Sequence, residues 1–290
     1  MLLRLAPWLF VVLWSTGYIA SKVGAEHAEP FTFLTLRFMI VLALLVPIVW
    51  FSGGRIPPWR DFTRAVLAGA VIHAVYLAGI LWALRAGMPA GVAALVVSLQ
   101  PIVTALLSGP LIGERVLARH WAGLVTGLAG AMLVLAPKTD LVGAAGIGPW
   151  SIAACLGSLT AITAGTLFQK ACCAHIDLRS AALPQYLGAL TVAAVGALAF
   201  ETREVNWTPE LWMALLWLAV ALSIGAIGLL MLLIRENAVW RTSALFYLVP
   251  PTTAVMAWAL FSETLTLVQV GGLVLVCAAV VMIEPSRRRT

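Results

Sequence analysis

The sequence predicts an all-α membrane protein of ten transmembrane helices, arranged as two inverted five-helix repeats around a central cavity. Hydrophobic residues make up 62% of the 290 positions and charged residues only 10%, far from the composition of a soluble domain. The charges gather in short gaps between apolar runs of membrane length. One pattern of apolar runs, prolines and glutamates also occurs twice along the chain.

Ten stretches hold the roughly 20 apolar residues that a helix needs to cross the hydrocarbon core. The connections are short, and no soluble domain is inserted between them. The first stretch lacks the small-residue cleavage site of a signal peptide, so we expect it to remain as a span. The expected spans are residues 5–24, 31–50, 63–84, 89–109, 120–137, 147–170, 180–200, 211–234, 240–261 and 266–283.

The basic residues divide unevenly between the two sides of these spans. With the N-terminus inside, 13 lysines and arginines fall on the cytoplasmic side and only four, Lys22, Arg85, Lys138 and Arg203, on the outer side. Cytoplasmic loops carry an excess of basic residues. We therefore expect an integral protein of the bacterial inner (plasma) membrane with both termini cytoplasmic, which requires an even number of spans.

Two apolar segments share one pattern. Gly91–Glu114 and Trp240–Glu263 each carry a proline near the middle, Pro101 and Pro250, 13 residues before the final glutamate. Proline inside a helix removes an amide donor and frees the carbonyl four residues earlier. In lipid such a carbonyl must find a partner or line a cavity. Two helices interrupted at matching depths therefore suggest a pathway through the protein.

The first parts of the two halves also match, at an offset of 148 residues that pairs Lys22 with Lys170, whereas the second parts match at 149. We therefore divide the chain into a first repeat over residues 1–139 and a second over residues 140–290, each with five spans. This division predicts two domains of similar size and common architecture.

The two repeats are expected to have opposite orientations in the membrane. Because five is an odd number of spans, the second copy must enter from the other side, which places Glu114 inside and Glu263 outside. Inverted repeats with interrupted helices are the architecture of secondary transporters, whose substrate site lies near the middle of the membrane.

The chain resembles the EamA type of the drug/metabolite transporter superfamily along nearly its whole length. The resemblance is carried by the duplicated five-span unit, LWST at residues 13–16, Arg37, and a proline followed by glutamate and then glycine in both halves. A narrower resemblance, carried by few residues, is to the YddG-like amino-acid exporters. The resemblance implies a central cavity and export of small metabolites or amino acids. Where the family often has an acidic residue before the repeat proline, this chain has Gln100 and Val249, which puts in doubt a mechanism based on a carboxylate there.

We predict a substrate site made of polar and aromatic side chains near the middle of several spans. His73 and Tyr76 are three residues apart and so share one helix face. The amide of Gln100 is costly in lipid unless it is bonded. Each candidate could equally serve packing or a structural hydrogen bond between helices. The predicted substrate-binding residues are Trp14, Thr16, His73, Tyr76, Gln100, Pro101, Thr163, Tyr247 and Pro250.

Two charge patterns bear on the mechanism. Arg37 is expected about 9 Å inside the outer membrane boundary, at 1.5 Å per residue, where it could extend outward, pair with a carbonyl, or attract an anion to the outer vestibule. No aspartate or glutamate falls in the middle third of any expected span, although proton-coupled carriers commonly use one. We therefore favour transport down the substrate's own gradient over a proton-carrying role for His73.

The sequence has no pattern typical of a catalytic, metal or cofactor site. A phosphate-binding loop is absent, which argues against ATP hydrolysis by this chain. The four cysteines lack metal-ligand spacing. The net charge of +6 comes without a basic face interleaved with aromatics, so we expect no nucleic-acid partner. We predict no enzyme activity and no cofactor.

The leading hypothesis is a secondary, non-ATP transporter that exports small amphipathic metabolites, first of all amino acids including aromatic ones, by alternating access. Its expected partners are the small-molecule substrate and the lipid bilayer. A nucleotide-sugar or drug carrier is the nearest alternative. An intramembrane hydrolase that uses Ser98 with His73, and a non-transporting membrane scaffold, remain as rivals from other classes.

Overall fold

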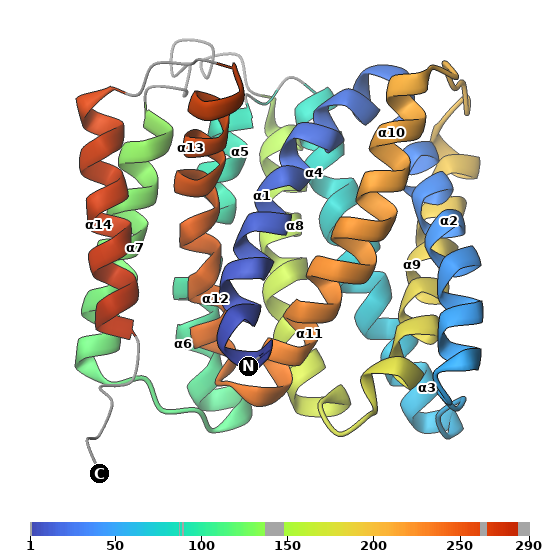
Figure 1. The fold of residues 1–290 in the computed structure, drawn as a ribbon, viewed down its shortest axis with the longest axis horizontal. Helices are drawn as coiled ribbons and strands as arrows, with labels where there is room; N and C mark the ends of the chain where they lie inside the picture. Colours follow the sequence, from blue (N-terminus) through green and yellow to red (C-terminus); the bar gives the residue numbers. More distant parts are fainter. Residues whose placement is uncertain (1, 87, 89, 137–147, 262–265, 284–290) are drawn as a thin grey trace.

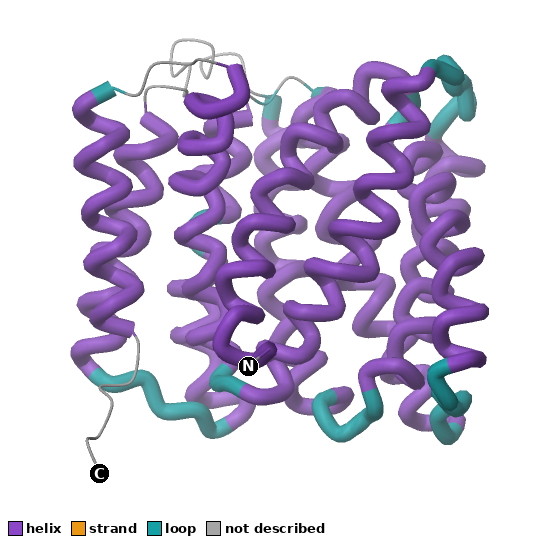
Figure 2. The backbone as a smooth tube through the Cα atoms, in the orientation of Figure 1, coloured by secondary structure: helices purple, strands orange, loops and turns teal. Residues whose placement is uncertain are grey.

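The computed structural model describes residues 2–86, 88, 90–136, 148–261 and 266–283. Helices standing side by side account for nearly all of them, as Figures 1 and 2 show. These residues include no β-strand; Ala28 and Val205 form an isolated antiparallel bridge between two loops. The all-helical fold expected from the sequence is confirmed. Lys138 and Glu263, which the sequence places on the outer side, lie outside the described residues.

Several helices are built from two or three elements in direct succession. The first-half elements are α1 (Leu2–His27), α2 (Pro30–Phe51), α3 (Trp59–Gly69), the π-helical η1 (Ala70–Val75), α4 (Tyr76–Arg85), α5 (Ala90–Val97), α6 (Gln100–Ile112) and α7 (Ala118–Leu135). The second-half elements are α8 (Pro149–Phe168), the π-helical η4 (Gln169–Cys173), α9 (Leu178–Phe200), α10 (Pro209–Trp217), the π-helical η5 (Leu218–Ala226), α11 (Ile227–Glu236), α12 (Val239–Ala244), the 3₁₀ turn η6 (Leu245–Leu248), α13 (Val249–Phe261) and α14 (Leu267–Ile283).

Seven of the helices in the described part of the chain are long and apolar enough to cross a membrane. Shorter apolar helices cover Leu5–Gly17 and Leu267–Ile283. The seven are Pro30–Phe51, Trp59–Arg85, Val92–Ile112, Ala118–Leu135, Pro149–Cys173, Leu178–Phe200 and Pro209–Glu236.

The starts of the elements recur along the chain. Helix α9 begins 148 positions after α2, and α12, α13 and α14 begin 149 positions after α5, α6 and α7. The π-helical segments η1 and η5 also begin 148 positions apart. In Figure 1, α1 begins at the lower end of the bundle, whereas α8 begins at the upper end. Elements of the same type therefore recur in the same order along the two halves of the sequence.

Both helices that carry the repeat prolines are interrupted there, as the sequence predicts. Helix α5 ends at Val97, and α6 begins at Gln100 directly before Pro101. In the second half, η6 separates α12 from α13, and Pro250 is the second residue of α13. The missing proline amide and the ring of proline both oppose an uninterrupted α-helix, which explains the breaks.

Five elements form one connected group: α1 and α2 contact each other and η5, α2 also contacts α9, and α9 contacts η1. Close approach of α3 to α9 depends on Gly69 and Gly188. A Cβ on Gly69 would collide with the carbonyl of Gln185, and one on Gly188 with the carbonyl of Val66. This contact brings the start of η1 against α9 and so places His73 of η1 near Tyr186 of α9.

Candidate functional site

A small cavity lies among these elements. Its volume is about 20 Å³, close to the space that a single water molecule needs. The lining residues are Trp14, Arg37, Phe38, Ile72, His73, Tyr76, Leu77, Tyr186, Leu222, Ser223 and Ile227. Four of them, Arg37, His73, Tyr186 and Ser223, form the polar part, which we call the Arg37 cluster.

Arg37 is the charged member of the cluster. Its side chain comes from α2 and the residue is only 2% exposed. The Nε atom donates a hydrogen bond of 3.0 Å to Ser223 Oγ on η5. Among the described residues, no aspartate or glutamate forms a salt bridge with Arg37. A buried guanidinium is costly without a paired anion, so the cavity carries a positive charge that the described side chains leave uncompensated.

His73 and Tyr186 form the other side of the cluster. Their rings stack with centroids 5.0 Å apart and planes at 11°. The Tyr186 hydroxyl donates to the Ser223 carbonyl oxygen over 2.6 Å. His73 Nε2 is buried and has no hydrogen-bond partner in the described part of the chain. The His73 ring sits in the π-helical turn η1, a type of irregularity that is frequent at functional sites.

The remaining walls are apolar and aromatic. Trp14 packs against Phe10 and Phe246, with ring centroids 5.2 Å and 5.1 Å away. Together with Tyr76 and Phe38 it gives the cavity aromatic surface beside the guanidinium. The arrangement suits a ligand that has an anionic group and an apolar body.

The structure brings three of the predicted site residues together at this cavity: Trp14, His73 and Tyr76. Thr16 lies elsewhere, where its hydroxyl donates to the Leu13 carbonyl at 2.7 Å and accepts a hydrogen bond of 3.0 Å from Trp217 Nε1. Trp217 is half-exposed, so Thr16 faces the periphery of the bundle.

The other predicted residues come from the interrupted helices and α8. Gln100 Nε2 donates to Ser243 Oγ over 3.0 Å, which joins α6 to α12. Buried oxygen atoms of Gln100, Thr163 and Tyr247 have no hydrogen-bond partner among the described residues. Pro101 and Pro250 stand in the first turns of α6 and α13. None of these five lines the 20 Å³ cavity.

Sequence reasoning left Tyr186 out and did not assign Arg37 or Ser223 to the site. The available signal for Arg37 was a lone basic residue in an apolar span, which the membrane makes costly unless it has a function or a partner. Tyr186 had no comparable signal, because its partner His73 is distant in the sequence. In the described ranges, no three His, Cys, Asp or Glu side chains gather as a metal site requires.

Charged contacts join loops and helix ends at both ends of the bundle. Between α1 and α2, Glu29 accepts hydrogen bonds from Arg85 Nη2 at 3.0 Å, Thr202 Oγ1 at 3.0 Å and the Arg203 backbone N–H at 2.9 Å. Burial alone would raise the pKa of Glu29, but these hydrogen bonds and the Arg85 charge outweigh it and lower the pKa below its ordinary value.

At the opposite end, Lys170 donates to three carbonyls at the end of α11. Its Nζ lies 2.9 Å from the oxygen of Ile234, 3.0 Å from that of Arg235 and 2.8 Å from that of Asn237. Glu114 accepts from the Val239 backbone N–H, with its two oxygens at 2.8 and 3.0 Å, where α12 begins. A cation at a helix C-terminus and an anion at an N-terminus are both stabilising.

Comparison with known proteins identifies the family and the fold of this chain. The model of the EamA-like transporter family matches residues 5–136 and again residues 149–284. The inner membrane transporter YedA of Escherichia coli K12 is 25% identical over 279 residues, 96% of this chain and 89% of that protein. A probable amino-acid metabolite efflux pump of Salmonella typhimurium LT2 is 27% identical over 281 residues, 93% of this chain and 90% of that protein.

A solved crystal structure has the same fold. The TM-score is 0.79 at 20% sequence identity, and the match covers 97% of this chain and 96% of the other. The family model matches both halves of the chain, and the apolar helices agree with a membrane setting. This chain is a membrane transporter and belongs to the EamA-like transporter family.

Proposed function

We propose that this protein exports small amphipathic carboxylates, first of all amino acids including aromatic ones, by alternating access without ATP. The observation that carries the proposal is the buried charge of Arg37 at the small cavity, which no acidic side chain of the described residues pairs with. The similarity to a relative named as a probable amino-acid metabolite efflux pump supports the choice of substrate and of export.

The Arg37 cluster would bind the carboxylate, and the aromatic walls would hold the side chain. A guanidinium binds a carboxylate through two parallel hydrogen bonds, which adds orientation to affinity. Ser223 orients Arg37 through its Nε, and in this proposal the two terminal nitrogens of Arg37 bind the substrate carboxylate. Trp14 and Tyr76 offer apolar surface to an aromatic or aliphatic body.

The present size of the cavity bears on the transport cycle. A cavity of about 20 Å³ has room for about one water molecule, which is too little for an amino acid. Substrate binding therefore requires the helices that line the cavity to separate. Movement of one half against the other is the alternating access that inverted-repeat transporters use.

The proposed architecture is ten spans in two inverted repeats, 1–139 and 140–290, with both termini in the cytoplasm of a bacterium. The recurring element starts and the double match of the family model support two repeats. The opposite ends at which α1 and α8 begin support the inversion. The excess of basic residues on one side of the expected spans supports the orientation.

We further propose uniport. Among the described residues, no aspartate or glutamate is buried. These residues therefore include no buried carboxylate that could carry a proton inside the membrane. The concentration gradient of the substrate would then drive export.

Counterflow in proteoliposomes tests the substrate class. Vesicles loaded with unlabelled phenylalanine are diluted into labelled phenylalanine or into labelled phenethylamine, which keeps the ring and the amine but lacks the carboxylate. We expect accumulation of the amino acid and not of the amine, because only the carboxylate pairs with Arg37. Equal accumulation of both would contradict the proposal.

The same vesicles test the energetics. An imposed pH gradient should leave the initial rate of phenylalanine uptake unchanged under uniport. A rate that requires the gradient would contradict uniport but not the carboxylate site. Empty vesicles give the background for both assays.

A further inference from the structure

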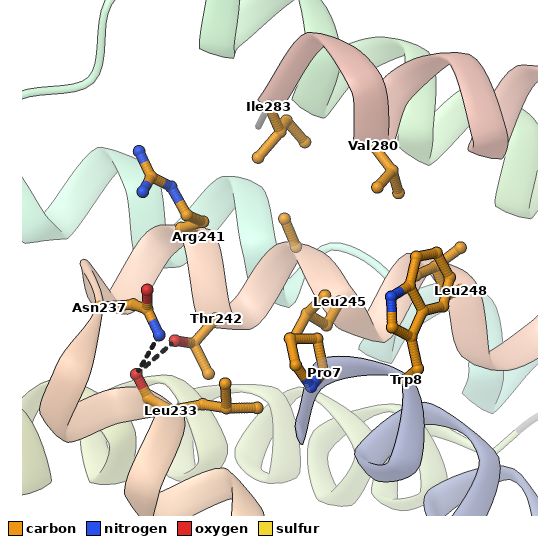
Figure 3. A pocket seen from close by; sticks show the side chains of 11 residues that line it. Pro7, Trp8, Leu233, Asn237, Arg241, Thr242, Leu245, Leu248, Val280 and Ile283 are labelled. Atoms are coloured by element: carbon orange, nitrogen blue, oxygen red, sulfur yellow. Dashed lines mark hydrogen bonds between the residues drawn. The ribbon is translucent and has the colours of Figure 1, made fainter. Parts of the chain in front are cut away.

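A second and larger cavity lies at the end of the bundle where α1 begins and α14 ends. Its volume is about 210 Å³, and Figure 3 shows its walls. We call it the Arg241 groove. The lining residues are Pro7, Trp8, Leu233, Asn237, Arg241, Thr242, Ala244, Leu245, Leu248, Val280 and Ile283. The two cavities share no lining residue.

One end of the groove is polar and positively charged. Asn237 Nδ2 and Thr242 Oγ1 both donate to the Leu233 carbonyl, at 3.1 Å each, as Figure 3 shows. Arg241 stands beside them, and its Nε is buried without a hydrogen-bond partner among the described residues. The guanidinium carbon lies 5.4 Å from the Trp240 ring centroid. Contact with an aromatic face orients the charge but does not neutralise it.

The charges around Arg241 leave it available for an anion. The Trp240 ring also contacts His120, with ring centroids 4.5 Å apart. His120 accepts a hydrogen bond from Arg119 Nε at 3.2 Å. A second arginine therefore adds to the positive potential here. Among the described residues, no acidic side chain forms a salt bridge with Arg241.

The other end of the groove is apolar and borders the surface of the bundle. In Figure 3, Trp8 and Leu248 lie at this end, with Val280 above them. Trp8 is 55% exposed, and its α1 neighbours Leu9 and Val12 are exposed as well. Helix α14 stands at the edge of the bundle in Figure 1. An apolar face of this kind in a membrane transporter is exposed to acyl chains.

We propose that the Arg241 groove binds an anionic phospholipid, with the phosphate of its headgroup on Arg241 and the start of an acyl chain against Leu248 and Val280. Arginine binds phosphate oxygens through paired hydrogen bonds, and basic pockets between membrane helices bind anionic headgroups. The polar end and the apolar end match the two parts of such a lipid. The site lies beside the repeat interruption at η6, so its occupancy would brace α12 against α1 and α14.

Lipid retention measured by native mass spectrometry tests this site. The full chain is reconstituted in nanodiscs with equal phosphatidylglycerol and phosphatidylcholine of the same acyl chains, then released with its bound lipid. We expect about a fivefold preference for phosphatidylglycerol, the effect of roughly one arginine near an anionic headgroup. Arg241→Gln should lower this preference to near unity.

Arg235→Gln is the matched control, because Arg235 lies at the same end of the bundle but pairs with Glu236 at 3.8 Å and does not line the groove. It should keep the preference. The apolar end is tested separately by Val280→Trp, which fills the groove and should reduce retention with Arg241 intact. No preference in the wild-type protein, or an unchanged preference in Arg241→Gln, would overturn the proposal.

Two further arms separate other occupants of the groove. An excess of glycerol phosphate should not displace the lipid. Displacement would show that the groove binds a free phosphate compound, which would contradict a lipid site. A transported amino acid should not displace it either, since competition would make the groove part of the transport route. A photoactivatable phosphatidylglycerol on the wild-type protein should label peptides of α12 or α14, and labelling only elsewhere would overturn the site without any variant.

Discussion

Arg37 is buried, and among the described residues one side-chain hydrogen bond holds it, from its Nε to Ser223 Oγ at 3.0 Å. The geometry assigns the two residues different parts in recognition. In the proposed site, Arg37 would supply the charge that meets a substrate anion, and Ser223 would fix the direction of the guanidinium. Loss of the serine hydroxyl should therefore weaken substrate binding without removing the charge.

Ser223→Ala is expected to raise the half-saturation concentration for amino-acid counterflow by about tenfold, since a hydrogen bond to a charged group is worth roughly 1.5–3 kcal/mol. The maximal rate should change less. Ser52→Ala serves as the control, because Ser52 directly follows α2 and its Oγ donates to the Val49 carbonyl oxygen of the preceding turn at 3.2 Å, away from both cavities. An unchanged half-saturation concentration in Ser223→Ala would contradict the orienting role.

Glu29 makes stability depend on acid pH. Its pKa is lower in the folded protein than its ordinary value of 4.5, so the carboxylate stabilises the fold at neutral pH. This contribution is lost as the pH falls below 4.5 and through the folded pKa. The thermal unfolding midpoint of the wild-type protein should therefore fall more steeply below pH 4.5 than that of Glu29→Gln. Parallel curves for the two proteins would show that Glu29 contributes nothing.

At the scale of the helices, glycine decides which faces pack closely. Helices α7 and α14 pack against each other at Gly130 and Gly272. A Cβ on Gly272 would lie 2.7 Å from the Gly130 carbonyl oxygen and 2.8 Å from the Val134 backbone nitrogen. Backbone atoms cannot move aside as a flexible side chain can, so the two helices would have to separate. Small residues are the usual means of close helix contact in membranes.

Gly272→Ala should lower the thermal unfolding midpoint in detergent, because overpacking typically costs about 1–3 kcal/mol. The adjacent glycine provides the control. A Cβ on Gly271 meets no atom within 4 Å, so Gly271→Ala should leave the midpoint unchanged or raise it through better helix propensity. Equal effects of the two substitutions would contradict the packing account.

The π-helical segments are the elements that the sequence did not predict. η1 and η5 carry His73 and Ser223 to the small cavity beside Arg37 from the two halves of the chain. The length of an apolar segment predicts a transmembrane span. It does not show where the hydrogen bonding changes to the wider π-helical turn. The breaks at Pro101 and Pro250, in contrast, were predictable because proline alone removes a backbone donor.

For the whole molecule, composition and apolar length were sufficient to predict an all-helical membrane protein. The candidate site was predicted less completely. Trp14, His73 and Tyr76 were found from their depth and spacing, and they line the cavity. The role of Arg37 depends on which neighbouring helix its side chain faces. Its expected depth in the membrane was also compatible with a side chain that extends outward to the membrane surface. The Tyr186 stack on His73 depends on the close α3–α9 contact at Gly69, which no local pattern shows.

The central claim for the whole molecule is that a solute carboxylate is bound by Arg37 between the two halves of the chain. Counterflow of labelled phenylalanine in proteoliposomes, measured for Arg37→Gln beside Arg60→Gln, tests it most directly. Arg60 is an exposed arginine outside both cavities, so its variant should transport at the wild-type rate. We predict that Arg37→Gln loses about 100-fold in transport, as expected for a charged contact with substrate, and that Arg37→Lys retains part of it. Wild-type transport by a correctly folded Arg37→Gln would contradict the account.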